Sequence, residues 1–192
     1  MSTVQHLSLH SDLEAVLTDF DSNLEAVHSV TDGLSYPELT SQPTPGASWS
    51  ILQCVEHLVL ANGFYTAGMA AVLEDKRSKN RLRAGPISPS AAGAVFLKKL
   101  EPPVNSKVRA PNKIIPRADK SKSEVLDAFT QSHRRIRETI LSASDLDLNA
   151  IRFRNPLLPL LRVRVGTGLL IMAAHERRHL WQAWQVRAEF AK

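Results

Sequence analysis

The chain has few of the sequence features that are typical of secreted and membrane proteins. Cys54 is the only cysteine among 192 residues, which excludes an internal disulfide and fits a reducing compartment. The N-terminal region has no basic stretch followed by an apolar run, and acidic residues begin at Asp12, so we expect no signal peptide. The longest apolar run, near residues 169–174, is too short to cross a bilayer. These absences predict a cytoplasmic protein with no membrane partner.

Segregated charge is also missing. The net charge of +5 would suit a nucleic-acid partner, but lysine and arginine are spread along the chain. Neither zinc-finger spacing, nor an RNA-binding aromatic pattern, nor a helix-turn-helix signature accompanies them. We therefore expect no specific nucleic-acid partner, and a basic surface that could serve an anionic small molecule. The length and the 43% apolar content predict a single domain over residues 1–192.

Apolar residues recur at helical spacing in four long segments, which we expect to be helices. These segments cover about residues 11–34, 51–75, 121–142 and 169–190. Three of them begin at a predicted capping box, in which a serine caps the helix and a Glu or Gln three residues later reaches back: Ser11 with Glu14, Ser50 with Gln53, and Ser121 with Glu124. Gly166 and Gly168 precede the last helix. The pattern predicts an all-α fold, an antiparallel four-helix bundle.

The connections between these helices differ in length. Residues 36–48 contain three prolines and a glycine and are predicted to be a loop. Residues 76–120 contain six prolines and leave room only for a short helix near 90–100. We interpret this long, irregular, Pro-rich connection between helices 2 and 3 either as a lid or partner surface or as a mobile insertion. No segment shows the alternation and turn chemistry of a β-hairpin.

His175 and His179 are the most informative pair in the sequence. Four residues apart on a helix, they share one face and can bind a single divalent metal ion. With Glu176 they also spell the H-E-x-x-H motif of zinc proteases. Those enzymes need a further downstream ligand, but Gln185 stands where one class has its third histidine, and Glu189 lies on the same helix as the pair. A protease is therefore not expected.

A third ligand must then come from upstream. The candidates are His6, His10, His28, His57 and His133. His57 is best placed because it follows the Ser50 cap by seven residues and lies within a long helix. His28 and His133 could equally be surface or core histidines, which is the commoner role of a lone histidine in a bundle.

The sequence also predicts the surroundings of four other side chains near the histidines. Glu176 points about 100° away from His175 around the helix, so we expect it to face solvent. Gln182 follows His179 by three residues, and it could either hydrogen-bond to that imidazole or pack in the core. Trp49 should pack as an apolar staple before the second helix. Cys54 is expected to be a small apolar side chain rather than a nucleophile or ligand.

Two segments together resemble one known family. Residues 49–58, WSILQCVEHL, resemble the W-S-x6-H-L segment of the DinB/YfiT-like superfamily, and residues 175–182, HERRHLWQ, resemble its H-E-x-x-H-x-x-Q segment. Their order, their separation and the four-helix pattern also agree, so the resemblance covers nearly the whole chain. Members are four-helix bundles, often homodimers, that hold a divalent metal with three histidines. The resemblance implies that the ligands here are His57, His175 and His179.

The resemblance also implies a range of functions. The superfamily includes S-transferases and isomerases that use low-molecular-weight thiols, along with members of unassigned activity. We expect metal-activated water or thiol chemistry on a small molecule, of hydrolase or thiol S-transferase type. The alternative is a non-catalytic bundle whose metal holds helices together or mediates association. A nitrogen-rich site suits zinc or nickel, with iron, manganese and copper as alternatives. Trp181 and Trp184 are expected in the core or in a homodimer interface.

Overall fold

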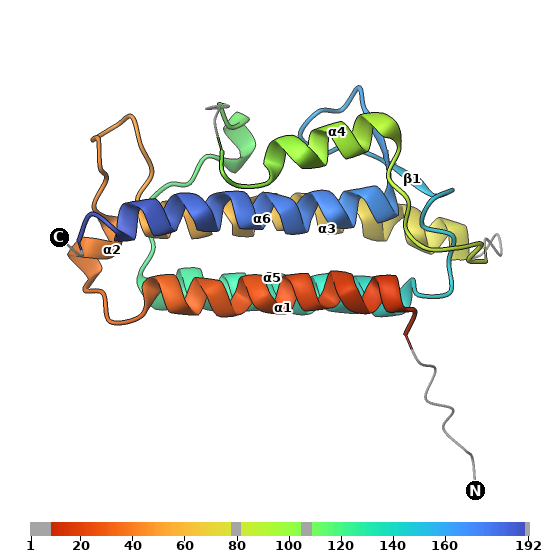
Figure 1. The fold of residues 1–192 in the computed structure, drawn as a ribbon, viewed down its shortest axis with the longest axis horizontal. Coiled ribbons are helices and arrows are strands. Elements are labelled where there is room, and N and C mark those ends of the chain that lie inside the picture. The colour runs from red at the N-terminus through yellow and green to blue at the C-terminus, as the bar shows by residue number, and fades with distance from the viewer. Residues whose placement is uncertain (1–8, 78–81, 105–108, 191–192) are drawn as a thin grey trace, which may run out of the picture.

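The computed structural model describes residues 9–77, 82–104 and 109–190, and most of them are helical. The four longest helices, α1 (Ser11–Thr31), α3 (Ile51–Arg77), α5 (Lys122–Ser142) and α6 (Val165–Arg187), lie side by side (Figure 1). Helices α1 and α3 each pack against both α5 and α6. The prediction of a mostly helical chain is confirmed.

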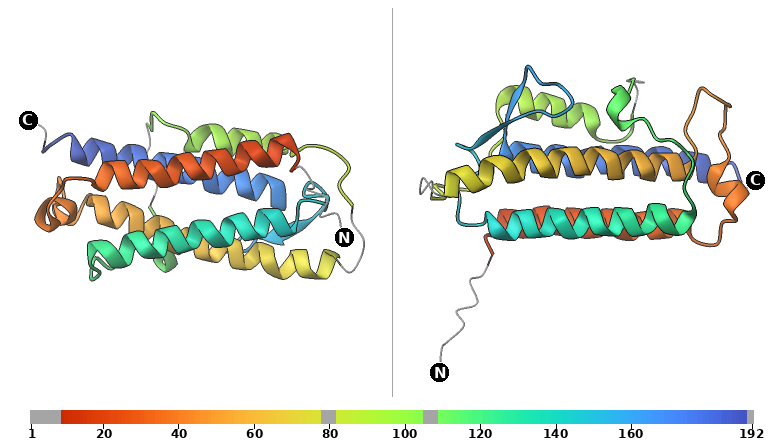
Figure 2. Two further views of the ribbon diagram at one scale, coloured as in Figure 1. Left: turned by 90° about the horizontal axis from the view of Figure 1, so that it is seen from below. Right: turned by 180° about the vertical axis from the view of Figure 1, so that it is seen from behind.

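The long connection determines the directions of these helices. Helices α1 and α6 run one way and α3 and α5 run the other, as the chain colours show (Figures 1 and 2). After α3 the chain returns along the length of the molecule through α4 (Ala91–Leu100) and the short 3-10 helix η1 (Asn112–Ile114) before α5 begins. Each long helix therefore has one parallel and one antiparallel neighbour, so the directions do not alternate as a fully antiparallel arrangement requires.

Two of the three predicted capping boxes are present. Ser50 Oγ accepts a hydrogen bond from the Gln53 amide, and the Gln53 side chain accepts one from the Ser50 amide. Ser121 and Glu124 make the same reciprocal pair at the start of α5. The box predicted at Ser11 is wrong, because α1 begins one residue earlier than a Ser11 cap allows. His10 holds the cap position there, and its carbonyl accepts the first hydrogen bonds of the helix.

The expected loop after α1 contains a short helix, α2 (Tyr36–Thr40). Ser35 and Glu38 form a capping box at its start, and Pro37 lies in its first turn, where its missing N–H costs no hydrogen bond. The predicted loop is therefore wrong over these five residues. The short helix expected near residues 90–100 is confirmed as α4, which Ser90 caps through the Gly93 amide.

A β-hairpin lies where none was predicted. Strands β1 (Arg152–Arg154) and β2 (Arg162–Arg164) pair antiparallel, with Phe153 opposite Val163. Immediately after it, α6 begins at Val165, so it includes the two glycines that were expected to precede the helix. A Cβ at Gly168 would lie 2.6 Å from the Met69 side chain. Close packing against α3 and the hairpin therefore requires glycine here and outweighs its low helix propensity.

The core is divided into two apolar clusters. One gathers around Phe20, Met69 and Ile136, and the other around Val27, Leu58 and Phe129. Between them, every long helix contributes a buried polar side chain, namely Asn23, Asn62, His133 with Ser132, and Glu176. No helix in the described part of the chain is long and apolar enough to cross a bilayer.

Candidate metal centre

Three histidines from two helices meet at one point. His57 lies on α3, and His175 and His179 lie one turn apart on the antiparallel neighbour α6. Each offers a ring nitrogen, and the three nitrogens lie within 4.8 Å of one another. Nε2 of His57 is 3.3 Å from Nε2 of His175. Two nitrogens on a tetrahedral zinc ion lie about 3.3–3.4 Å apart, so the arrangement could hold a metal ion.

The other candidate ligands lie elsewhere. His10 and His28 are exposed, and His133 is buried among the polar side chains between the two apolar clusters. His6 lies outside the described residues. Of the upstream histidines that the structure describes, His57 alone joins the pair on α6.

Hydrogen bonds orient two of the imidazoles. Nδ1 of His57 lies 2.7 Å from the carbonyl oxygen of Ile114, and Nδ1 of His179 lies 3.1 Å from Oε1 of Gln182. Because both partners are oxygen acceptors, each Nδ1 carries the proton and each Nε2 keeps a lone pair for a metal ion. Of the two alternatives left open for Gln182, the hydrogen bond to His179 is present, and the Ile114 carbonyl is a partner that the sequence did not indicate.

A buried carboxylate fixes the segment that supplies this carbonyl. Glu56 precedes His57 on α3 and is 2% exposed. Its Oε2 accepts hydrogen bonds from the Arg117 and Ala118 amides at 3.0 and 3.1 Å, and Oε1 lies 2.8 Å from Lys120 Nζ. The end of the long connection is thus bound to α3 by two consecutive residues, Glu56 and His57.

Burial keeps the three imidazoles neutral. It lowers the pKa of His57 to about 4, although the hydrogen bond to Ile114 opposes the shift. Burial, followed by the nearby charges of His57 and Arg178, lowers the pKa of His175 to about 3. The pKa of His179 is lowered well below its usual value, mainly by burial. At neutral pH the lone pairs that a metal ion needs are therefore available without proton release.

Trp49 covers one side of the site. Its ring centroid lies 4.6 Å from that of His57 and 5.6 Å from that of His179. The indole also packs against the cluster around Val27 and Leu58, as an apolar staple would. The side chain therefore joins the start of α3 to the imidazoles, a contact that its place before the cap did not reveal.

The three histidines are the candidate protein ligands of this site. Within the described residues, no fourth His, Cys, Asp or Glu joins the group. Cys54 lies one turn before His57 but is buried, and burial raises the pKa of its thiol, which agrees with an inert side chain. His175 is mostly buried but, unlike His57 and His179, partly exposed to solvent. An ion held here would keep at least one coordination position for water or a substrate.

Comparison with known families agrees with this geometry. The family model of the DinB superfamily matches residues 19–183, a range that includes all three histidines. The chain belongs to the DinB superfamily. A search of the curated proteins found no match to this DinB-superfamily chain, and a search of the solved structures found none either. Membership and the histidine cluster together support a metal-binding protein.

Glu176 does not face solvent in this DinB-superfamily protein, so that prediction is wrong. Its side chain is 0% exposed and lies among four helices. The Nδ2 groups of Asn23 and Asn62 donate to its two oxygens at 2.9 and 2.7 Å, and Nε2 of His133 lies 3.0 Å from Oε1. Helices α1, α3 and α4 cover most of α6. The face of α6 that carries Glu176 therefore points to the centre of the molecule, next to the face that carries the histidines.

The sequence held a signal for this polar group. Asn23 lies on the apolar stripe of α1, three residues after Phe20 and four before Val27. Asn62 likewise follows Leu58 by four residues on α3. An amide on a stripe that faces the core must find a hydrogen-bond partner inside it. The stripe therefore predicts a buried partner, but it does not say which residue that partner is.

Proposed function

We propose that this protein is a metal-dependent enzyme that activates water or a thiol against a small molecule, as a hydrolase or a thiol S-transferase. The observation that carries the proposal is the convergence of three imidazoles without a fourth described ligand. Three neutral imidazoles leave the charge of a divalent ion uncompensated, and such an ion lowers the pKa of a bound water or thiol.

The protein's own residues would prepare this chemistry. His57, His175 and His179 would hold the ion, with the Ile114 carbonyl and Gln182 keeping two of the rings in the metal-binding tautomer. Trp49 would exclude water from one side. Arg178 carries positive charge close enough to lower the pKa of His175 and His179, and we extend the proposal to an anionic substrate such as a carboxylate-bearing thiol. Zinc or nickel fits the nitrogen donors, as do iron, manganese and copper.

A structural metal is the competing proposal. Its support is that His57 and His179 are buried and that the histidines join two of the four long helices. Either function suits a single-domain four-helix bundle in the cytoplasm.

We also propose a homodimer that uses Trp184, which is 40% exposed and has the Arg187 guanidinium over its ring. Light scattering at micromolar concentration tests the dimer, and a monomer would contradict it.

The experiment that separates the two functions is a metal and activity survey. Metal analysis of the purified protein identifies the ion, and the loaded protein is then assayed with low-molecular-weight thiols and with activated esters. We expect turnover that disappears in His175→Ala, while His28→Gln, an exposed histidine, retains it. Full metal loading with no turnover on either substrate class would favour the structural role.

A further inference from the structure

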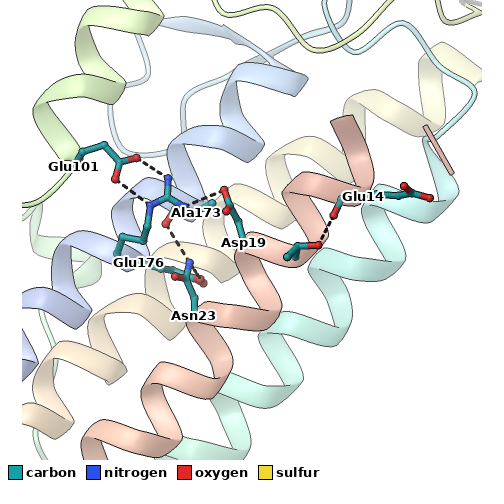
Figure 3. Close-up of polar contacts among 8 residues, drawn as sticks. Glu14, Asp19, Asn23, Glu101, Ala173 and Glu176 are labelled. Atoms are coloured by element: carbon teal, nitrogen blue, oxygen red, sulfur yellow. Dashed lines mark hydrogen bonds and ion pairs between the residues drawn. The ribbon is translucent and has the colours of Figure 1, made fainter. Parts of the chain in front are cut away.

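The polar residues between the two apolar clusters have a common centre. Glu176 receives one contact from each of the other three long helices, through Asn23 of α1, Asn62 of α3 and His133 of α5. The Asn23 amide also donates to the carbonyl oxygen of Ala173, one turn earlier on α6 (Figure 3). One carboxyl group thus ties α6 to every other long helix at the same level.

A buried polar group of this kind is not the most stabilising way to fill a core. Well-packed apolar side chains often stabilise a core at least as much as a buried polar network does. Buried polar groups are better known for fixing one alignment of neighbouring helices. Apolar contacts tolerate sliding and rotation of a helix, whereas hydrogen bonds require particular distances and angles. The cluster around Glu176 therefore restricts how α6 can rotate and slide.

The two candidate ligands on α6, His175 and His179, lie next to Glu176. His175 precedes Glu176 by one residue and His179 follows it by three, so they point about 100° and 60° away around the same helix. The next residue, Arg177, is also held, because it pairs with Asp19 of α1 and with Glu101 at the end of α4 (Figure 3). A rotation of α6 by about 10° would move a ring nitrogen by about 1 Å, which is more than a metal site tolerates.

We infer that Glu176 is a positioning residue, whose contacts with Asn23, Asn62 and His133 set the rotation of α6 at which His175 and His179 meet His57. This inference rests on the proposed metal site. It gives the Glu of the H-E-x-x-H segment a role inside the core, instead of the role of a base at the metal. Glu176 acts through the helix and touches neither an ion nor a substrate.

The test compares E176Q with a variant that weakens the core elsewhere. In E176Q one oxygen becomes an NH2 group, which cannot accept from the donors that surround it. Leu13→Ala is the control, since Leu13 is fully buried in α1 yet belongs to the apolar cluster around Phe20. Affinities for Zn²⁺ and Co²⁺ are measured by competition with a chromophoric chelator, together with urea unfolding of the metal-free proteins. Asn23→Ala removes one of the three contacts to Glu176, together with the hydrogen bond to the Ala173 carbonyl, and serves if E176Q does not fold.

We expect E176Q to lose about 10–100-fold in metal affinity and to change the visible spectrum of bound Co²⁺. Leu13→Ala should bind like wild type even when it is equally destabilised. Asn23→Ala should lie between wild type and E176Q. Wild-type affinity in a folded E176Q, or an equal loss in Leu13→Ala, would overturn the inference.

A second measurement remains decisive if the wild type binds no metal and the proposed function fails. The imidazole signals of the metal-free protein report the placement of the rings by NMR. In E176Q the signals of His175 and His179 should shift, while those of the exposed His10 and His28 stay in place. In Leu13→Ala all four should keep their wild-type positions. Unshifted His175 and His179 signals in E176Q would contradict the positioning role without any reference to metal binding.

Discussion

At the scale of residues, the direction in which a side chain points determines what it can contact. His175, Glu176 and His179 occupy one turn of α6, yet the two histidines meet α3 and the carboxylate enters the core. Hydrogen bonds to Ile114 and Gln182 then select the metal-binding tautomer of two rings. The chemistry of this site therefore depends on which neighbour each side chain faces.

The lowered pKa values of the histidines predict how stability depends on pH. Between pH 6.5 and about 4 the unfolded chain protonates His57 and His175, but the folded protein does not, so unfolding takes up protons. The stability of the metal-free protein should be greatest above pH 6.5 and fall as the pH drops towards 4. Urea midpoints at pH 7.5, 6 and 5 in chelator measure this fall.

The control for this pH dependence is the exposed His28. His28→Gln should leave the slope unchanged, whereas His57→Ala should reduce it. Carboxyl groups with lowered pKa values, such as those of Asp12 and Glu124, begin to contribute only below about pH 4.5. A midpoint that is equal at pH 7.5 and pH 5 would contradict the burial of neutral imidazoles.

Trp49 should report metal binding directly. Its ring lies within 6 Å of two ligand rings, so Co²⁺ or Ni²⁺ in the site should quench its fluorescence. Titration of Trp49→Phe should show most of the quenching lost, while Trp184→Phe, which replaces an exposed tryptophan, should keep it. Quenching that is undiminished in Trp49→Phe would place the ion away from Trp49.

At this scale the sequence indicated which histidines lie together, but not what surrounds them. The spacing of His175 and His179 on a helix fixes that they share a face, and this is a local property. Which face of α6 meets the core is not local, because α6 is buried on most sides and has no clear polar stripe. Glu176 was therefore placed wrongly, and the contacts of His133 were not foreseen.

At the scale of elements, the end of the long connection is part of the site. Glu56 binds the Arg117 and Ala118 amides, and the same segment brings the Ile114 carbonyl to His57. These contacts do not agree with a mobile insertion over residues 114–120. The part of the connection next to α5 instead orients the His57 imidazole.

Glu56→Gln should loosen this segment. The amide oxygen can still accept from the Arg117 and Ala118 amides, but the NH2 group faces Lys120 Nζ and the ion pair is lost, so we expect a loss of about 1–3 kcal/mol in stability. Hydrogen exchange at residues 114–120 should become faster, and metal affinity should fall because His57 is held less firmly. Lys120→Met, which removes only the half-exposed partner, should have a smaller effect on both. Unchanged exchange in Glu56→Gln would contradict the account.

Element boundaries followed the sequence where capping chemistry is local. Ser50, Ser90 and Ser121 cap helices through side chains that lie within three residues. The hairpin and the start of α6 were missed because each strand has three residues and because Gly168 is explained by close contacts with Met69 and Phe153, neither of which is near it in the sequence. Tertiary packing outweighed local propensity at both places.

At the scale of the whole molecule, two apolar clusters provide stability without a metal ion. They span all four long helices and bury branched apolar side chains from each, with aromatic side chains from α1, α3 and α5. Apolar burial contributes about 25 cal/mol per Å², so the core should remain folded when the site is empty. Small zinc-dependent domains lack such a core and unfold when their metal is removed.

Removal of the metal should therefore leave the helices intact. We expect chelator-treated wild type, His175→Ala and His179→Ala to keep the circular dichroism of the loaded protein. Their melting temperatures should fall by only a few degrees, which is the linkage stabilisation that a bound ion adds. Loss of helicity on chelation would defeat the catalytic proposal in favour of a structural metal.

The central claim is that His57, His175 and His179 together hold one divalent ion with open positions. X-ray absorption of the zinc-loaded protein tests it most directly, because it reports the identity, number and distance of the ligand atoms. We predict three imidazole nitrogens at about 2.0–2.1 Å, at least one further oxygen, and loss of one imidazole in His57→Ala. A sulfur ligand at about 2.3 Å, or an unchanged spectrum in His57→Ala, would contradict the account.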